Sequence, residues 1–325
     1  MENKGRAAGL VLIIAMLLLA GCRDGAVKTE VQGAQGASIH TGEKLTVYTS
    51  FYPIYDLAAK IGGDKARIVN MVPAGMEPHD WEPSAADRAG LEHADILLYN
   101  GLGLEHWIDK IKDGLRDKDI VIIEASEGIE TLTEAGHDQA HADKENYGGD
   151  GSVTDPHVWL SPLNAKKEMG NIKNGFILAD PENEAYYEAN YERYSVEFDA
   201  LDKEFREALS SLPCRDIVVA HEAFGYLCNA YGLHQVAIEG LSPDAEPSPA
   251  RMAEMIDFAR ANHIKVIFFE EMVSPDIAET IARAVGAETG VLNPLEGLSQ
   301  EDMDAGADYF SIMRENLAAL RYALE

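Results

Sequence analysis

Three histidines stand in sequence contexts that suit the binding of a metal ion. His79 lies in a proline-rich segment, His157 precedes the start of an expected helix, and His221 directly follows an apolar run. Neutral imidazole is a common zinc ligand. No short motif such as His-x-x-x-His links the three, so spacing alone leaves open whether they share one ion or are structural.

A framework of alternating strands and helices must position these side chains. Expected strands lie at residues 45–48, 67–72, 96–99 and 120–123, and expected helices at 54–61 and 84–93. Ser84 and Asp87 resemble a capping box at the start of the second helix. Apolar strands spaced by helices indicate a parallel sheet. The polar, glycine-containing residues 133–155 then interrupt the pattern and predict a loop.

A long helix is predicted from Pro181 to about Ser210. Its large apolar residues recur at threes and fours: Tyr187, Tyr191, Tyr194, Phe198, Leu201, Phe205 and Leu209. Such a helix would span about 45 Å. Strands are expected again at 217–220, 235–238, 266–269 and 288–292. The fold class is therefore α/β, with two βα lobes of parallel sheet joined by one long backbone helix. His79 and His221 would lie beyond the carboxyl ends of strands, where such sheets bind ligands.

The amino-terminal residues predict export. Lys4 and Arg6 precede a short apolar run, and the small residues before Cys22 resemble a lipoprotein cleavage site. We expect a signal peptide at 1–21, a lipid on Cys22 and a flexible tether at 22–43. The rest divides into a first lobe at 44–180, a linking helix at 181–212 and a second lobe at 213–325. The protein would sit on the outer face of the cytoplasmic membrane, held there by its lipid alone.

Charge and cysteine content narrow the function further. A net charge of −29 disfavours binding to nucleic acid and to anionic lipid, although it also fits simple solubility. Cys214 and Cys228 are an even pair that could form a disulfide in an oxidising compartment. Cys228 also lies in an apolar helical pattern, which is typical of a buried free thiol. Sequence leaves both states open.

Five segments resemble the zinc- and manganese-specific solute-binding proteins of ABC transporters. They are PHDWEPS at 78–84, DPHVWL at 155–160, HEAFGY at 221–226, GLSPDAEPS at 240–248 and NPLEGL at 293–298. The resemblance covers nearly all of residues 44–323 in order. It implies a monomeric receptor that is not an enzyme. This receptor would hold a metal between two lobes and pass it to a membrane permease and, through that, an ATPase.

The resemblance also implies which residues bind the metal. His79 and His157 would come from the first lobe and His221 from the second. Many members have an aspartate where this chain has Asn293, a poorer ligand for a divalent cation. Glu296 resembles the glutamate of a zinc-binding branch and is expected to be the fourth ligand. Glu270 and Asn293 are the alternative ligands, or residues that orient a ligand such as an imidazole.

Three imidazoles and one carboxylate favour Zn²⁺, whereas Mn²⁺ prefers more oxygen and remains an alternative. His137 and His141 lie where zinc-specific members often carry a histidine-rich stretch. With so few ligands, this segment is interpreted as a solvated insert rather than an auxiliary metal loop. A zinc hydrolase, which keeps an open position for water, and a metal-dependent adhesin are the rival functions.

Overall fold

The computed structural model describes residues 44–135, 152–242, 247–272 and 274–325. The predicted signal peptide, Cys22 and the tether lie outside these residues, and so do His137 and His141. None of the helices within the described ranges is both long and apolar enough to cross a bilayer.

The first lobe is built on a four-stranded parallel sheet in the order β2-β1-β3-β4. Its strands are β1 (Leu45–Thr49), β2 (Ala66–Asn70), β3 (Ile96–Tyr99) and β4 (Val121–Glu124). The crossover helices are α1 (Tyr52–Gly62), α2 (Ala85–Leu91) and α3 (Ile108–Leu115). Alternation along β3 sends Ile96 and Leu98 toward the core shared with α1, and Leu97 toward α2 and α3. The capping box of Ser84 and Asp87 is present.

The second lobe repeats this plan with a parallel sheet in the order β10-β9-β7-β8. Its strands are β7 (Asp216–Val219), β8 (His234–Ala237), β9 (Val266–Phe269) and β10 (Glu288–Val291). Its helices are α6 (Gly225–Tyr231), α7 (Pro249–Ala261), α8 (Asp276–Val285), α9 (Gln300–Ala305) and α10 (Tyr309–Leu324). Val218 and Ile267 face α7 and α8, whereas Val219 and Phe268 face the core that includes α10.

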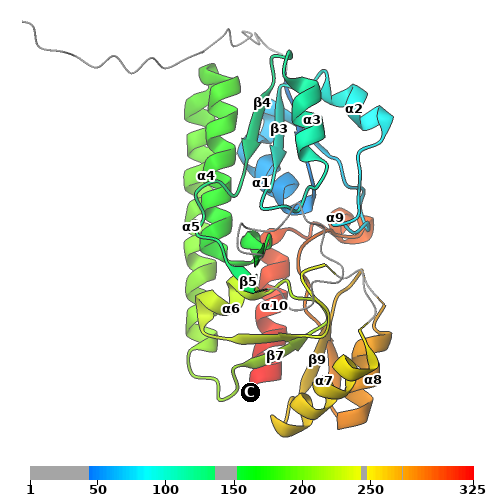
Figure 1. Ribbon diagram of the computed structural model, residues 1–325. Coiled ribbons are helices and arrows are strands. Elements are labelled where there is room, and N and C mark those ends of the chain that lie inside the picture. The colour runs from blue at the N-terminus through cyan, green and yellow to red at the C-terminus, as the bar shows by residue number, and fades with distance from the viewer. Residues whose placement is uncertain (1–43, 136–151, 243–246, 273) are drawn as a thin grey trace, which may run out of the picture. The chain divides into compact units, whose positions relative to one another are not determined.

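Two long helices pack side by side along their length (Figure 1). The predicted long helix is α5 (Glu184–Leu209), which follows a 3₁₀ turn at Pro181–Asn183. Its 26 residues span about 39 Å. Its partner is α4 (Pro162–Ala179), which follows the 3₁₀ turn Val158–Leu160 and whose length no sequence pattern indicated. Helix α4 packs on β3 and β4 of the first sheet, whereas α5 contacts α1 in the first lobe and both α6 and α10 in the second. The single long helix α5 therefore joins the two lobes, as expected from the sequence.

The prediction of a loop at 133–155 is wrong at the two ends of this segment. Its ends form a two-stranded antiparallel ribbon of β5 (Thr133–Ala135) and β6 (Ser152–Thr154). Backbone pairing needs no apolar periodicity, and three-residue strands leave too short a pattern to recognise in the sequence. The ribbon leads directly to Asp155 and His157.

One hydrophobic core continues through both lobes. It includes Ile54 of α1, Phe198 and Phe205 of α5, and Tyr309 and Leu320 of α10. The hydroxyl of Tyr309 donates to the carbonyl of Trp159 at 2.7 Å, so polar contacts cross the lobes as well. Opening the lobes widely would expose this core, so the packing favours small hinge motions.

Candidate metal centre

Four loops bring together the residues expected to bind metal. His79 lies between β2 and α2, and His157 caps the 3₁₀ turn before α4. His221 lies two residues beyond β7, and Glu296 lies between β10 and α9. Their donor atoms all lie within 4.8 Å of one another. The four residues singled out from the sequence therefore form one cluster, contributed by both lobes.

Five of the six distances among the four donor atoms fit a tetrahedral ion site. The Nε2 atom of His157 lies 3.3 Å from Nε2 of both His79 and His221. Oε1 of Glu296 lies 3.3, 3.0 and 3.5 Å from Nε2 of His79, His157 and His221. Four ligand atoms at the corners of a tetrahedron, about 2.0–2.1 Å from zinc, are roughly 3.3 Å apart. One small cation at the centre would reach all four.

The cluster is buried, and within the described parts of the chain one of its carboxylate oxygens lacks a hydrogen-bond partner. The side chains of His157 and His221 are 0% exposed, and those of Glu296 and His79 are 3% and 10% exposed. Oε2 of Glu296 has no hydrogen-bond partner among the described residues. A buried carboxylate oxygen without a partner is costly, and a metal ion would relieve that cost.

Two carboxylates orient the imidazole rings. Nδ1 of His157 lies 2.8 Å from Oδ1 of Asp155, and Nδ1 of His221 forms a hydrogen bond with Oε1 of Glu270. A carboxylate accepts a hydrogen bond from Nδ1–H and so keeps the proton on Nδ1, which leaves Nε2 as the lone-pair donor that faces the cluster. Glu270 thus contacts the side of His221 that faces away from the cluster, as the orienting alternative requires.

Asp155 was not expected in this role from the sequence, although it stands two residues before His157. The backbone N–H of His157 also donates to Oδ1 of Asp155 at 2.9 Å. The carboxylate therefore turns back onto its own loop. The signal was present in the run Asp155-Pro156-His157, where a short acidic side chain can reach the residue two positions later.

Protonation holds the cluster together in the absence of metal. Burial lowers the pKa of His157, but its hydrogen bonds to Asp155 and Glu296 outweigh burial and raise the pKa to about 10. Burial raises the pKa of Glu296, yet the charges of His221 and His79 and hydrogen bonds from His157 hold it well below its usual range. An ionised Glu296 facing a protonated His157 therefore substitutes for the charge of the ion.

Glu77 is a further acid near the site that the sequence did not single out. It accepts the backbone N–H of His79 at 2.9 Å and so fixes the loop that carries this histidine. Burial and the negative charge of Glu296 raise the pKa of Glu77 to about 8. The loop that carries His79 is therefore held by a buried acid that lies within the electrostatic field of Glu296.

Asn293 lies beside the cluster but outside the donor set. Its Oδ1 accepts the backbone N–H of Leu295 at 2.7 Å, and its Nδ2 donates to Oε2 of Glu271 at 3.0 Å. Both polar atoms of the amide are therefore already in use. The expectation of Asn293 as an alternative ligand finds no support in this geometry.

The loops of the two lobes also touch each other beside the cluster. The N–H of Gly75 donates to the carbonyl of Leu298 at 3.1 Å, and Nε1 of Trp159 donates to the carbonyl of Pro294 at 2.7 Å. A Cβ on Gly297 would lie only 3.1 Å from the sulfur of Met272, so the loop packs tightly there. These contacts describe a closed arrangement of the lobes around the site.

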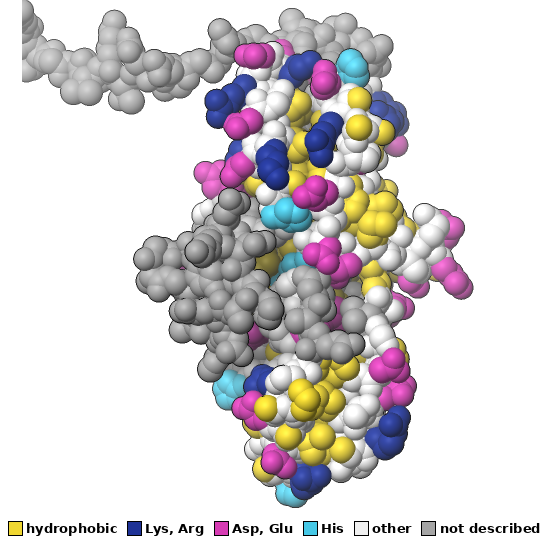
Figure 2. All heavy atoms as spheres, turned by 45° about the vertical axis from the view of Figure 1, so that its right-hand side comes forward, with side chains coloured by type: hydrophobic (Ala, Val, Ile, Leu, Met, Phe, Trp, Pro, Cys, Tyr) yellow, Lys and Arg dark blue, Asp and Glu magenta, His cyan; other side chains and the backbone are white. Residues whose placement is uncertain are grey.

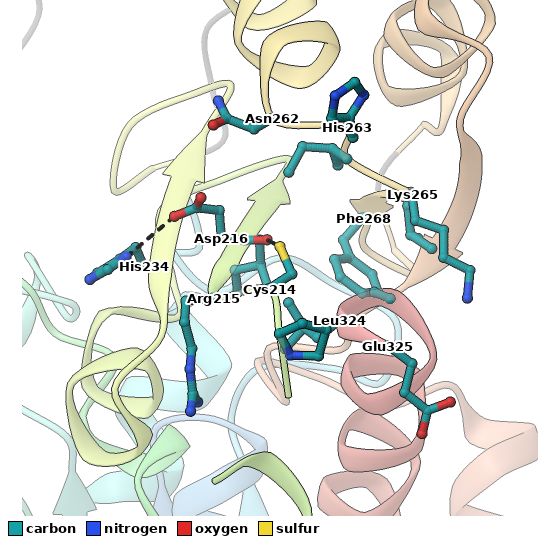
Figure 3. A pocket seen from close by; sticks show the side chains of 15 residues that line it. Cys214, Arg215, Asp216, His234, Asn262, His263, Lys265, Phe268, Leu324 and Glu325 are labelled. Atoms are coloured by element: carbon teal, nitrogen blue, oxygen red, sulfur yellow. Dashed lines mark hydrogen bonds and ion pairs between the residues drawn. The ribbon is translucent and has the colours of Figure 1, made fainter. Parts of the chain in front are cut away.

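A separate pocket lies at the amino ends of strands β7, β8 and β9, whereas His221 lies beyond the carboxyl end of β7 (Figure 3). It has a volume of about 600 Å³, and its lining includes Cys214, Asp216, His234 and Lys265. His234 pairs with Asp216 at 3.2 Å, and Lys265 donates to the carbonyl of Tyr322 at 2.7 Å. Cys214 and Cys228 are both free thiols, which settles the choice that the sequence left open.

The negative charge of the chain is distributed over its surface. Acidic side chains (magenta) are spread over the face shown in Figure 2, with lysine and arginine side chains (dark blue) mixed among them in its upper part. The net charge of −29 disfavours binding to nucleic acid and to anionic lipid.

Comparison with known proteins agrees with this site. The chain is 40% identical over 318 residues to the high-affinity zinc uptake system protein ZnuA of Bacillus subtilis, covering 98% of this chain and 97% of that protein. It is 40% identical to the zinc-binding lipoprotein AdcA of Streptococcus pneumoniae, covering 86% of this chain. This chain spans about half the length of that relative, 55%.

A solved structure shares the fold. It is the Zn(II)-bound ZnuA-like domain of Streptococcus pneumoniae AdcA, at 39% identity and a TM-score of 0.74, covering 86% of this chain and 99% of that one. A family model described as zinc-uptake complex component A, periplasmic (ZnuA) matches residues 47–323. The chain therefore belongs to the ZnuA family of zinc-uptake solute-binding proteins.

Proposed function

We propose that this protein is the extracellular solute-binding component of an ABC importer, and that it captures Zn²⁺ between its two lobes. The observation that carries the proposal is the convergence of three Nε2 atoms and Oε1 of Glu296 at tetrahedral spacing. The ion is cargo rather than a resident cofactor. His79, His157, His221 and Glu296 are its ligands, with Asp155 and Glu270 holding two of the rings.

The ligand set favours zinc over manganese. Three imidazoles and one carboxylate suit the tetrahedral preference of Zn²⁺, whereas Mn²⁺ favours six oxygen-rich ligands. The relatives are named for zinc, and one of their structures contains Zn(II). A closed set of four protein ligands also leaves no position for a reactive water, which favours capture over hydrolysis.

Capture exchanges protons for the ion. Zn²⁺ displaces the proton of His157, and neutral imidazoles with ionised Glu296 replace the water around the ion. Because ligands come from both lobes, the bound ion links them and stabilises the closed form. The lobes at 44–180 and 213–325, with the linker at 181–212, then act as one receptor that a permease distinguishes from its open form.

The membrane context of this receptor follows from its amino-terminal sequence. Cleavage after Gly21 and a lipid on Cys22 would anchor the protein to the outer face of the cytoplasmic membrane. Residues 22–43 would tether the folded part within reach of the permease and its ATPase. The family name and the lipoprotein name of a relative support this placement.

The test is a measurement of metal content and stoichiometry in the purified chain. Native mass spectrometry and elemental analysis should find one zinc per chain. The His79→Ala variant should lose the ion while keeping its circular dichroism spectrum. Zinc-dependent hydrolytic turnover, or zinc retained at full stoichiometry without His79, would contradict capture at this site.

A further inference from the structure

The loop that carries Glu296 has an unusual backbone. Leu295, directly before Glu296, has a φ of 61° and is 0% exposed. Left-handed conformations are unfavourable for a residue with a branched side chain and persist only where the surroundings enforce them. Neighbouring residues must therefore hold the backbone of Leu295 in this conformation. The direction of the Glu296 side chain depends on that backbone conformation.

Asn293 supplies one part of this constraint. Its side-chain Oδ1 accepts a hydrogen bond from the backbone N–H of Leu295 at 2.7 Å, which closes an Asx turn. Its backbone is held by a buried partner, because Asn293 donates its N–H to Oδ1 of Asn316 at 2.8 Å, and Nδ2 of Asn316 donates to its carbonyl at 2.7 Å. Asn316 is only 2% exposed.

The amide nitrogen of Asn293 also has a hydrogen-bond partner. Nδ2 of Asn293 donates to Oε2 of Glu271, which follows the β9 strand and stands next to Glu270. An aspartate at position 293 could still accept the N–H of Leu295, but it would present a second oxygen to the Glu271 carboxylate. Two carboxylate oxygens at that distance repel each other, so only an amide satisfies both partners.

We propose that Asn293 is the positioning residue that directs Glu296 to the ion, and that it does so by bridging Leu295 and Glu271. This inference rests on the proposed zinc-binding function. The same bridge keeps the amide oxygen of Asn293 engaged with backbone, and so withholds a fifth ligand from the ion. Asn293 thereby favours an ion that accepts four ligands over one that requires more oxygen.

The test compares wild type with Asn293→Asp, Glu271→Gln and the double variant in the full chain. Zinc affinity is measured by competition with a chromophoric chelator, and Co²⁺ binding by its visible absorption, which is strong in tetrahedral sites. We expect N293D to weaken zinc binding about tenfold, the effect of one lost charge-assisted hydrogen bond, and to weaken the tetrahedral cobalt bands. An added negative charge alone would strengthen cation binding, so a loss cannot come from charge.

The double variant provides the matched rescue. The amide introduced at position 271 can donate to the carboxylate introduced at position 293, so N293D/E271Q should recover zinc affinity to within about threefold of wild type and regain the cobalt bands. E271Q alone should stay within about twofold, because the new side-chain carbonyl at position 271 can still accept from Asn293. Loss and recovery of the cobalt bands in variants that keep the circular dichroism spectrum of wild type would report on ligand geometry rather than on folding.

The outcomes separate this proposal from the function on which it rests. If wild type binds no zinc, the proposed function fails. If wild type binds zinc but N293D keeps both its zinc affinity and its cobalt bands, only the positioning role fails. Tighter zinc or manganese binding by N293D, unaffected by E271Q, would overturn the positioning role and make position 293 a ligand position.

Discussion

The two ends of strand β7 carry similar residues but differ in what those residues can do. At its amino end, Asp216 pairs with His234 beside Cys214 in the pocket of Figure 3. Beyond its carboxyl end, His221 joins the metal cluster. Both regions hold a histidine next to a carboxylate, so residue type alone does not distinguish them.

Burial and direction make the difference. The pair of Asp155 and His157 in the cluster is 4% and 0% exposed, whereas Asp216 and His234 are 33% and 73% exposed. In the cluster each Nε2 points to the other ligand atoms, and a carboxylate holds the far nitrogen of two rings. A histidine and an acid form a metal site only where several loops aim their donors at one buried point.

Removing a histidine at each end of β7 should produce the largest contrast. We expect His221→Ala to weaken zinc binding more than about a hundredfold, because it removes a ligand, and the loss of a mere orienting group already costs about 10–100-fold. His234→Ala should leave the affinity unchanged. Isothermal titration with a competing chelator measures both. Equal losses in the two variants would contradict the distinction between the regions.

Acidification should weaken the binding of zinc to the cluster. The raised pKa of His157, about 10, means that the metal-free site holds this proton at neutral pH and must release it to bind zinc. Each released proton lowers affinity about tenfold per pH unit, so we expect about a hundredfold loss between about pH 7.5 and pH 5.5. An affinity that stays flat over this range would show that histidines are not the ligands.

The same proton has the opposite effect on the metal-free fold. A raised folded-state pKa stabilises the fold fully below the ordinary value of 6.5, and this contribution is lost as pH rises through about 10. The metal-free protein should therefore become less stable from neutral to alkaline pH, as thermal unfolding with a chelator present would show. The His157→Gln variant should lose this part of the pH dependence.

Removing the orienting carboxylate should have a smaller effect. Asp155→Ala frees the ring of His157 while leaving all four ligands in place, and we expect zinc affinity to fall about tenfold. Asp216→Ala is the matched control, since it frees the exposed ring of His234. If D155A binds zinc as tightly as D216A does, then Asp155 contributes nothing to the ligand geometry.

The apolar periodicities predicted much of the framework. Runs such as Val266–Phe269 mark buried parallel strands because both faces are covered by helices, and the pattern along α5 identified the long helix. The sequence did not predict the short ribbon of β5 and β6 or the length of α4, because neither has a strong periodic signal. The long helix, expected from Pro181, begins at Glu184, because its first residues form a 3₁₀ turn that the apolar pattern does not distinguish from an α-helix.

The sequence by itself determined the ligand types and the loops that carry His79, His157, His221 and Glu296, because these follow strands or open helices with recognisable signals. Only the tertiary structure decided that their donor atoms meet at one buried point. It also decided that Asn293 engages both ends of its amide, with Leu295 and Glu271. Directions of side chains from loops far apart in the chain depend on how two lobes share one core, and no local pattern encodes that.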